Sequence, residues 1–293
     1  MPKSLVRVSI NFAKEDWPRA RQFLSAIGRP DLARAPQNLF GYTLKLGGEH
    51  EFLEFKAVAE LFDFAKNLSV GRENRYTSRE LESASLLSVR YTRRARGAGG
   101  PESGTRYDFD DGCPCCGTAS RQISELFVKG SLPDQTGLIQ LETGEWLLSQ
   151  ELADVLAESF RGAELRLTRA KRTGNSLPWL QVRAEATLPR IDAKTTGVVV
   201  SEQCVCCSRD GHFGTTREPF ELHYAPQACS SGSDVMATWE HFGLSRLRTP
   251  RSDTVLAKPG LVISSRLFRG LIAQKVRGLA FTPVICDGTE TPP

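Results

Sequence analysis

The sequence lacks several features by which a protein's class is usually recognised. Nothing in its 293 residues approaches the run of about 20 apolar residues that a membrane-spanning helix needs. The N-terminus, residues 1–7, has no apolar stretch of signal-peptide length. We therefore expect a protein without a membrane partner that is located in the cytoplasm. In that compartment thiols stay reduced, and clustered cysteines are more often metal ligands or catalytic groups than disulfides.

Signatures of common catalytic and nucleotide-binding sites are also absent. The chain has no P-loop, no Rossmann glycine set, no H-E-x-x-H motif and no G-x-S-x-G nucleophile elbow. The formal charge of +4, from 38 basic and 34 acidic residues, is too small to indicate nucleic acid unless it is concentrated on one face. These absences favour a protein that is not an enzyme.

What the sequence does contain is two cysteine-rich turns. Residues 113–117 read Cys-Pro-Cys-Cys-Gly and residues 204–208 read Cys-Val-Cys-Cys-Ser, so each has a C-x-x-C spacing with an extra cysteine inside it. A C-x-x-C turn supplies half of a tetrahedral four-sulfur zinc site. Two matched copies predict turns that meet in the fold around one structural Zn²⁺. The predicted ligands are Cys113, Cys116, Cys204 and Cys207.

Other interpretations of these cysteines stay open at this stage. In one interpretation Cys115 and Cys206 are additional ligands, which would allow two separate metals. In another, one of them replaces its neighbouring cysteine as a ligand. His212 is the histidine nearest the second turn and is an alternative ligand. Buried thiols without a metal and a redox C-x-x-C are the remaining interpretations. Cys229, in a polar loop, is interpreted as unpaired.

The first third of the chain predicts α+β structure. Apolar residues alternate over residues 6–12, as in a half-buried strand, and follow helical spacing over residues 17–27. The glycine-rich segment 97–104 is interpreted as a flexible hairpin loop or link. Further strands are expected at 40–46 and 87–91. We also expect a helix whose apolar face continues through residues 58–68, and a short helix that begins with a capping box of Thr77 and Glu80.

The rest of the chain contains an internal repeat. Residues 147–165 and 262–281 each predict a strand end, a serine N-cap, a short helix, an Arg-Gly turn and a returning strand. Ser149 and Ser264 are interpreted as caps rather than nucleophiles. The fold class predicted is α+β, with mixed or antiparallel sheets, short helices and a duplicated C-terminal region held by the four-cysteine zinc knuckle. The predicted domains are 1–100 and 101–293, the latter with halves at about 105–190 and 191–286.

The paired turns and the closing block, residues 261–284, resemble the double-CXXCG motif proteins that occur in paralogous sets in myxobacteria. The resemblance covers the layout from about Cys113 to Val284. Gly117 matches the glycine of the motif, whereas Ser208 departs from it. Some members are named as immunity proteins of contact-delivered toxin pairs. The resemblance therefore implies a non-enzymatic immunity protein that binds and neutralises a cognate bacterial toxin, with a structural zinc site.

Two other functions remain as alternatives. A zinc-ribbon-like nucleic-acid-binding protein would use basic residues such as Arg90, Arg93, Arg94, Arg96 and those of 169–172. Acidic residues are almost as numerous, and no aromatics interleave with the basic runs as stacking platforms, so nucleic acid is the less favoured partner. A thiol–disulfide oxidoreductase needs its C-x-x-C at a helix start, but residues 123–128 read as a strand.

Overall fold

A computed structural model of the chain describes residues 3–32, 41–93, 97–133, 137–215, 217–230, 232–248 and 253–286. The chain divides into two compact units: unit 1 comprises Met1–Thr77 with Thr215–Phe220, and unit 2 comprises Ser78–Gly214 with Glu221–Pro293. None of the helices described is long and apolar enough to cross a membrane.

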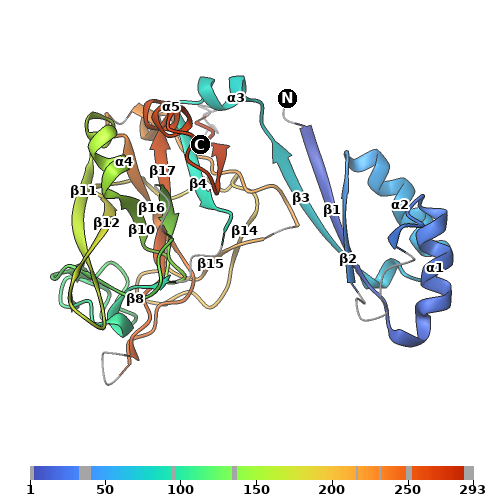
Figure 1. Cartoon of the computed structure of the whole chain (residues 1–293), viewed down its shortest axis with the longest axis horizontal. Helices are drawn as coiled ribbons and strands as arrows, with labels where there is room; N and C mark the ends of the chain where they lie inside the picture. Colours follow the sequence, from blue (N-terminus) through green and yellow to red (C-terminus); the bar gives the residue numbers. More distant parts are fainter. Residues whose placement is uncertain are drawn as a thin grey trace, which may run out of the picture. The chain divides into compact units, whose positions relative to one another are not determined.

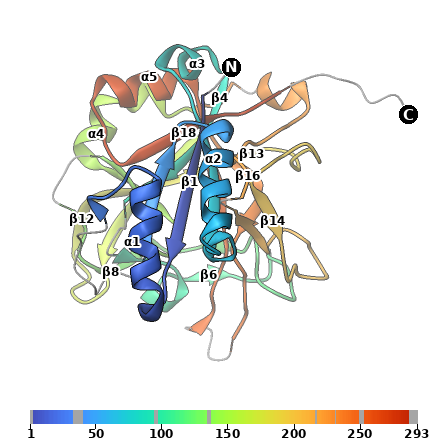
Figure 2. The same ribbon diagram turned by 90° about the vertical axis from the view of Figure 1, so that its right-hand side faces the viewer.

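Unit 1 is a three-stranded sheet with two helices on one face (Figures 1 and 2). The strands are β1 (Lys3–Asn11), β2 (Gly41–Leu46) and β3 (Leu68–Arg75), with β1 in the middle and antiparallel to both. The helices are α1 (Trp17–Ala26) and α2 (Glu49–Leu61), and two short 3-10 helices are η1 (Lys14–Asp16) and η3 (Ala65–Asn67).

The core of unit 1 follows from the patterns in the sequence. Alternate β1 residues are buried, and so is the face of α1 that carries Trp17 and Phe23. The Phe12 ring packs edge-on against Phe23 and Phe64, with centroids 6.0 and 4.9 Å apart. This confirms the predicted first strand and helix. The expectation that a helical face runs on to residue 68 is wrong, because α2 ends at Leu61 and Leu68 begins β3.

Unit 2 is built on two large sheets. The first has the order β5-β8-β11-β12-β10-β9, and the second β13-β16-β17-β4-β18. Among the strands described, the pairs β8–β11 and β13–β16 are parallel and the others antiparallel, so the predicted α+β fold class with mixed sheets is confirmed. The strands of the first sheet are β5 (Gly97–Ala98), β8 (Leu126–Gly130), β9 (Leu138–Gln140), β10 (Trp146–Ser149), β11 (Ala163–Ala170) and β12 (Ser176–Ala184). Those of the second are β4 (Leu86–Tyr91), β13 (Ala186–Thr187), β16 (Val235–Phe242), β17 (Lys258–Ser264) and β18 (Leu279–Pro283).

Smaller elements complete unit 2. Two-stranded ribbons are formed by β6 (Tyr107–Asp108) with β7 (Arg121–Gln122), and by β14 (Val198–Val200) with β15 (His212–Gly214). The α-helices are α3 (Ser78–Ser83), α4 (Gln150–Val155) and α5 (Ser265–Ala273). Short 3-10 helices are η4 (Pro101–Ser103), η5 (Ala157–Ser159) and η6 (Pro226–Ser230).

The boundary between the units differs from the predicted one at residue 100. It lies after Thr77, and β4 belongs to unit 2 because it forms antiparallel pairs with β17 on one side and β18 on the other. Strand β4 was correctly located in the sequence, but its partners lie near the other end of the chain. Periodicity identifies a strand without identifying its neighbours.

Both repeat blocks fold as a strand, a helix and a strand. β10–α4–β11 and β17–α5–β18 each place their two strands on either side of a third strand, β12 in the first sheet and β4 in the second. The Ser264 hydroxyl accepts a hydrogen bond from Leu267 N at 3.2 Å, which confirms that cap. Ser149 occupies the predicted N-cap position of α4, but its hydroxyl accepts from Gly137 N at 3.0 Å rather than from a backbone N–H of the helix.

The two blocks share one hydrophobic core. Leu152 and Leu156 of the first block lie in the same buried cluster as Leu267 and Leu271 of the second. Asp234 joins the blocks through polar contacts. Its carboxylate accepts the backbone N–H of Arg161 at 3.2 Å, the Ser264 hydroxyl at 2.5 Å and the Arg266 Nε at 3.0 Å. α4 and α5 lie at the same end of unit 2 (Figures 1 and 2).

The interpretation of residues 97–104 as a flexible loop is wrong. Gly97 pairs with Gly130 in the first sheet, and Pro101 and Ser103 are buried. A Cβ atom at Gly99 would lie 3.0 Å from both the Leu126 side chain and the Glu145 carboxylate. The glycines therefore permit close packing of this segment.

Candidate metal centre

The two cysteine turns meet in unit 2. The Sγ atoms of Cys113 and Cys204 are 3.7 Å apart, and those of Cys116 and Cys207 are also 3.7 Å apart. All four Sγ atoms lie within 4.8 Å of one another. A Zn–S bond of about 2.3 Å gives a tetrahedral edge of about 3.8 Å. The predicted convergence is confirmed, and this group of sulfurs can hold a metal ion.

The turns have matching backbones. In the first, Gly117 N donates to Cys113 O at 2.7 Å, and in the second, Ser208 N donates to Cys204 O at 2.9 Å. The closing residues both have left-handed φ angles, +77° at Gly117 and +52° at Ser208. Serine therefore takes the conformation that glycine adopts more easily, at a cost of about 1–2 kcal/mol. The departure from the C-x-x-C-G pattern leaves the turn intact.

Thr118 supports the first turn. Its carbonyl accepts from Cys113 N at 2.9 Å, and its hydroxyl accepts from the Cys116 thiol at 3.1 Å. The same hydroxyl donates to Ser245 Oγ at 2.9 Å, and Ser245 Oγ also accepts from Ala257 N at 2.8 Å. Cys116 is buried. The first turn is therefore anchored to the segment that leads into β17.

Asp210 supports the second turn. Its buried carboxylate accepts from Cys204 N at 2.9 Å through one oxygen and from Ser245 N at 3.0 Å through the other. Ser245 is thus hydrogen-bonded to the supports of both turns. Such contacts behind the ligands fix the ligand geometry before a metal arrives.

The thiols differ in how readily they ionise. Burial opposes ionisation of Cys113, but the backbone N–H groups of Cys116 and Cys115 and the neighbouring thiols outweigh it and lower its pKa to about 7. Burial raises the pKa of Cys116 and of Cys207. Because thiolates are the metal-binding form, a cation entering this group would displace protons from the buried thiols.

The extra cysteines of the two turns form a disulfide. Cys115 and Cys206 are bonded across the turns, with Cα atoms 6.4 Å apart, and both are exposed. Their sulfurs also lie within 4.8 Å of those of Cys113 and Cys204, so reduction of the disulfide would create a second group able to hold a metal. The disulfide ties the tips of the two turns together and leaves the other four thiols free.

The expectation that Cys229 is unpaired is wrong. It is disulfide-bonded to Cys286, with Cα atoms 6.3 Å apart. Neither residue lies in a recognisable motif, and their separation of 57 residues gives no local signal. An even count of eight cysteines was the one hint in the sequence that the two outside the turns might pair.

His212 does not join either sulfur group among the residues described. Its ring is buried, with Nδ1 3.2 Å from Arg209 O and Nε2 3.4 Å from Gln203 Nε2. His212 belongs to β15 and helps to position the second turn through Gln203, whose Nε2 also donates to Ser208 O at 2.9 Å.

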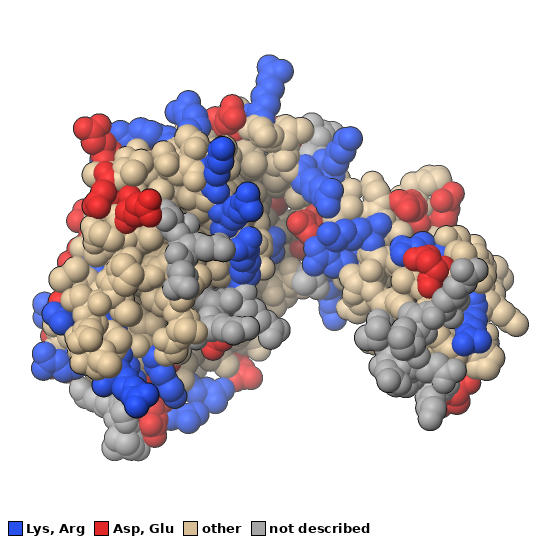
Figure 3. All heavy atoms as spheres, viewed as in Figure 1, with Lys and Arg blue, Asp and Glu red and all other residues tan. Residues whose placement is uncertain are grey.

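Two of the basic residues considered for nucleic-acid binding have local partners. Arg169 pairs with Glu125, and Lys171 donates to Glu102 O at 2.6 Å. Arg94 and Arg96 lie outside the described residues. Figure 3 shows acidic and basic side chains on the same face of unit 2, with the basic ones in several separate groups.

Comparisons with known proteins add no assignment, because no family model, no curated protein and no solved structure matches the chain. The class of site is therefore defined by its geometry: a four-sulfur group, able to hold a metal ion, made by two turns 91 residues apart.

Proposed function

We propose that this chain is a non-enzymatic immunity protein that binds and neutralises a cognate bacterial toxin, and that its two cysteine turns hold one structural Zn²⁺. The observation that carries the metal part is the mutual approach of Cys113, Cys116, Cys204 and Cys207 within 4.8 Å. The toxin part rests on the resemblance of these turns and of the C-terminal block to double-CXXCG immunity proteins.

The donor set favours zinc in a structural role. Four soft sulfur ligands at tetrahedral spacing suit Zn²⁺, and four protein ligands leave no position open for a substrate or a catalytic water. Cys113, Cys116, Cys204 and Cys207 would hold the ion, with Thr118 and Asp210 orienting them.

The proposal includes duplication of the C-terminal region. Its support is that the two repeat blocks have the same strand–helix–strand order and both flank a third strand. On this view the halves meet at Asp234, which contacts Arg161 of the first block and Ser264 of the second, and at Ser245 behind the turns, and the metal fixes the second of these junctions. The result is a rigid scaffold from which a surface can grip another protein.

Elemental analysis of protein purified under reducing conditions tests the metal. We expect about one zinc per chain, retained on dialysis, and proton release when zinc is added to stripped protein. Protein that is fully folded with no bound metal, before and after zinc addition, would contradict the structural zinc site.

Co-expression tests the toxin. The chain is expressed with the product of the neighbouring gene, and relief of that product's toxicity is scored together with recovery of a complex. The matched control is the same strain with a chain carrying a stop codon early in unit 1. Failure to relieve toxicity and failure to form the complex would count against the immunity function.

The location of this action is part of the proposal. We place it in the cytoplasm, whereas two disulfides are more usual in oxidising compartments. Trapping of free thiols with an alkylating reagent at the moment of lysis distinguishes a reducing compartment from an oxidising one. Eight modified cysteines indicate a reduced cytoplasmic protein, and four indicate that the disulfides exist in the cell.

The Cys115–Cys206 disulfide favours one second candidate, a thiol–disulfide oxidoreductase. As a dithiol, this pair would reduce a substrate disulfide, pass it two electrons and return to the disulfide form. Insulin reduction by metal-free protein, lost in Cys115→Ser but not in Cys116→Ser, would support this candidate over the structural zinc site.

A further inference from the structure

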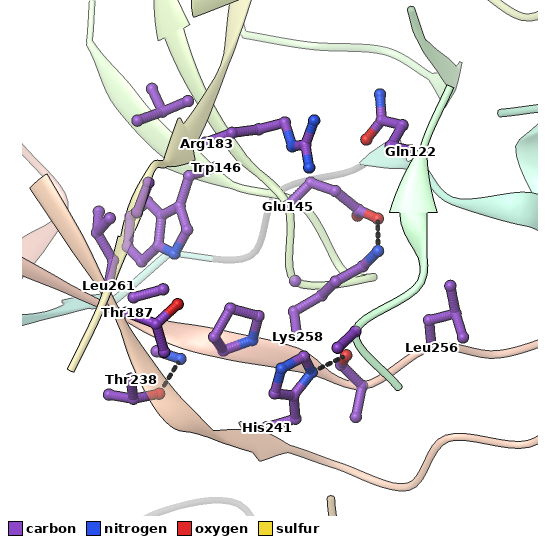
Figure 4. A pocket seen from close by; sticks show the side chains of 18 of the residues that line it. Gln122, Glu145, Trp146, Arg183, Thr187, Thr238, His241, Leu256, Lys258 and Leu261 are labelled. Carbon is purple, nitrogen blue, oxygen red and sulfur yellow. Dashed lines mark hydrogen bonds and ion pairs between the residues drawn. The ribbon is translucent and has the colours of Figure 1, made fainter. Parts of the chain in front are cut away.

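Unit 2 contains a cavity of about 300 Å³ that borders the cysteine turns, because Ala119 and Arg209, which follow the two turns, are among its lining residues. Residues of β10 and β12 in the first sheet line it together with residues of β16 and β17 in the second (Figure 4). Gln122 of β7 and Tyr107 of β6 also line it. A cavity of this size is at the small end of the range for ligand sites.

A charged pair lies inside this cavity. Lys258 Nζ is 3.1 Å from Glu145 Oε1 and also donates to the Tyr107 hydroxyl at 3.1 Å. Burial opposes the charge on Lys258, but Glu145 and Tyr107 outweigh it and raise its pKa. Lys258 therefore keeps its charge, and it lies beside Glu145, whose side chain is only 2% exposed.

The remaining charges on the cavity wall are positive. Arg183 and Arg209 line the cavity alongside Lys258, whereas Glu145 is the acidic residue among the lining residues. Figure 4 shows Arg183 reaching from β12 toward Gln122. Its contact with Glu164 Oε2 is a long one of 3.3 Å, and Glu164 also pairs with Arg166 at 2.6 Å. Burial lowers the pKa of Arg183, and the charge of Arg166 adds to this. The cavity thus has a surplus of positive charge that an anion would relieve.

A buried donor in the same wall lacks a partner. Trp146 is 5% exposed, and its indole Nε1–H has no hydrogen-bond partner among the described residues. An unsatisfied buried donor costs about 1–3 kcal/mol, so a ligand acceptor here would be favourable. The walls beside it are apolar, formed by Val182, Leu261 and the indole ring itself.

We propose that this cavity binds a small organic carboxylate with an apolar body. The carboxylate pairs with Arg183 and takes the Trp146 N–H, and the apolar body lies against Val182 and Leu261. A carboxylate suits the surplus charge and the planar guanidinium, which can donate two parallel hydrogen bonds to it. This site is independent of the proposed immunity function and of the metal.

Ligand-observed NMR titration with benzoate tests the proposal on the full chain. Benzamide is the neutral analogue of the same shape, and benzylamine is the cationic one. We expect benzoate to bind at least about tenfold more tightly than either, as the loss of a charge-assisted contact implies. Equal binding of benzoate and benzamide, or no binding of benzoate, would overturn the proposal.

Two substitutions locate the binding. Arg183→Gln should weaken benzoate binding at least about tenfold. Arg166→Gln is the matched control, because Arg166 contacts the same Glu164 but does not line the cavity, and it should leave binding unchanged. Equal effects of the two would indicate nonspecific charge attraction and contradict the site.

A third variant covers the case in which Arg183→Gln fails to fold. Ala237→Leu adds volume to the cavity wall on β16 without removing a charge. We expect it to abolish benzoate binding while the far-ultraviolet circular dichroism stays unchanged. Benzoate binding that survives in this folded variant would place the ligand elsewhere and overturn the proposal.

Discussion

A Cβ atom at Gly117 would lie 2.6 Å from Leu247 Cδ2, whereas Ser208, at the equivalent position of the second cysteine turn, carries its side chain in the same left-handed conformation. Cys116 of the first turn is buried and rests on the Thr118 hydroxyl. Cys204 of the second is held by the carboxylate of Asp210. The first turn is therefore fixed by packing, and the second by a charged acceptor.

This difference teaches what a short motif specifies. The cysteine spacing and the backbone hydrogen bond are the same in both turns, as a four-sulfur metal site would require. The closing residue is set by its neighbours. Glycine is required where Leu247 and Leu256 cover the first turn, whereas the second turn holds serine at a φ of +52°. Substitutions in the two turns should therefore change the free energy of unfolding by different amounts.

Removal of a ligand should have the largest effect. Cys116→Ser should abolish zinc binding and lower the free energy of unfolding by about 5 kcal/mol or more, because the metal stabilises only the folded state. Cys115→Ser, in the same turn, removes the disulfide but keeps the four proposed ligands. It should retain about one zinc per chain. Metal content and urea unfolding measure both, and equal zinc loss in the two variants would assign Cys115 to the metal.

The closing residues should respond differently to substitution. Gly117→Ala should destabilise unit 2 by about 3 kcal/mol, from the left-handed backbone and the contact with Leu247. Ser208→Gly should change stability by less than about 1 kcal/mol, since relief of backbone strain is offset by a more flexible unfolded chain. Urea unfolding of zinc-loaded protein compares them. Similar losses in both would mean that the turns are supported alike.

The supports of the turns provide a third comparison. Asp210→Asn replaces one of the two acceptor oxygens by an NH₂ donor that faces a backbone N–H. It should lower the free energy of unfolding by about 2 kcal/mol. Thr118→Val removes neutral hydrogen bonds from the first turn and should cost about 1 kcal/mol. The measurement is the unfolding midpoint in guanidinium at constant zinc. A larger effect of the Thr118 variant would reverse our assignment of the supports.

The last comparison concerns pH. Burial lowers the pKa of His241 to about 4, partly opposed by its hydrogen bond to Ala257 O at 2.8 Å. Below pH 6.5 the unfolded chain binds a proton at this residue that the folded chain does not, so stability falls between pH 6.5 and 4. The loss reaches up to about 2 kcal/mol at pH 5.

His241→Gln should remove this part of the pH dependence. The control is His50→Gln, because His50 has a side chain that is 90% exposed in unit 1. Urea unfolding of both variants at pH 7 and pH 5 gives the comparison. If His241→Gln loses as much stability between pH 7 and pH 5 as the wild type does, the His241 ring does not stay neutral in the folded protein.

The sequence predicted what local patterns encode. The first strand and helix of unit 1, strand β4 and the meeting of the cysteine turns all follow from periodicity or from paired spacing. β3 was missed because it is an edge strand whose residues are nearly all half-buried, so its sequence shows no alternation.

Features made by distant residues could not be predicted. The Cys229–Cys286 disulfide and the contact of Lys258 with Glu145 join residues that no motif connects. Gly99 signalled flexibility in the sequence, whereas its neighbours Leu126 and Glu145 make it a close-packing position. Only the tertiary structure supplies these neighbours.

The location of β4 has a consequence for synthesis of the protein on the ribosome. Ser88 bonds to Thr282, 194 residues later, so β4 emerges long before the strands on either side of it. At a translation rate of about 5–20 residues per second, synthesis of the chain from Ser88 to Thr282 takes roughly 10–40 s. During that time an apolar strand of the nascent chain has two open edges, a state in which chaperones bind and aggregation begins. Translation that stops before β17 therefore yields a polypeptide in which an interior strand of a sheet stays unpaired.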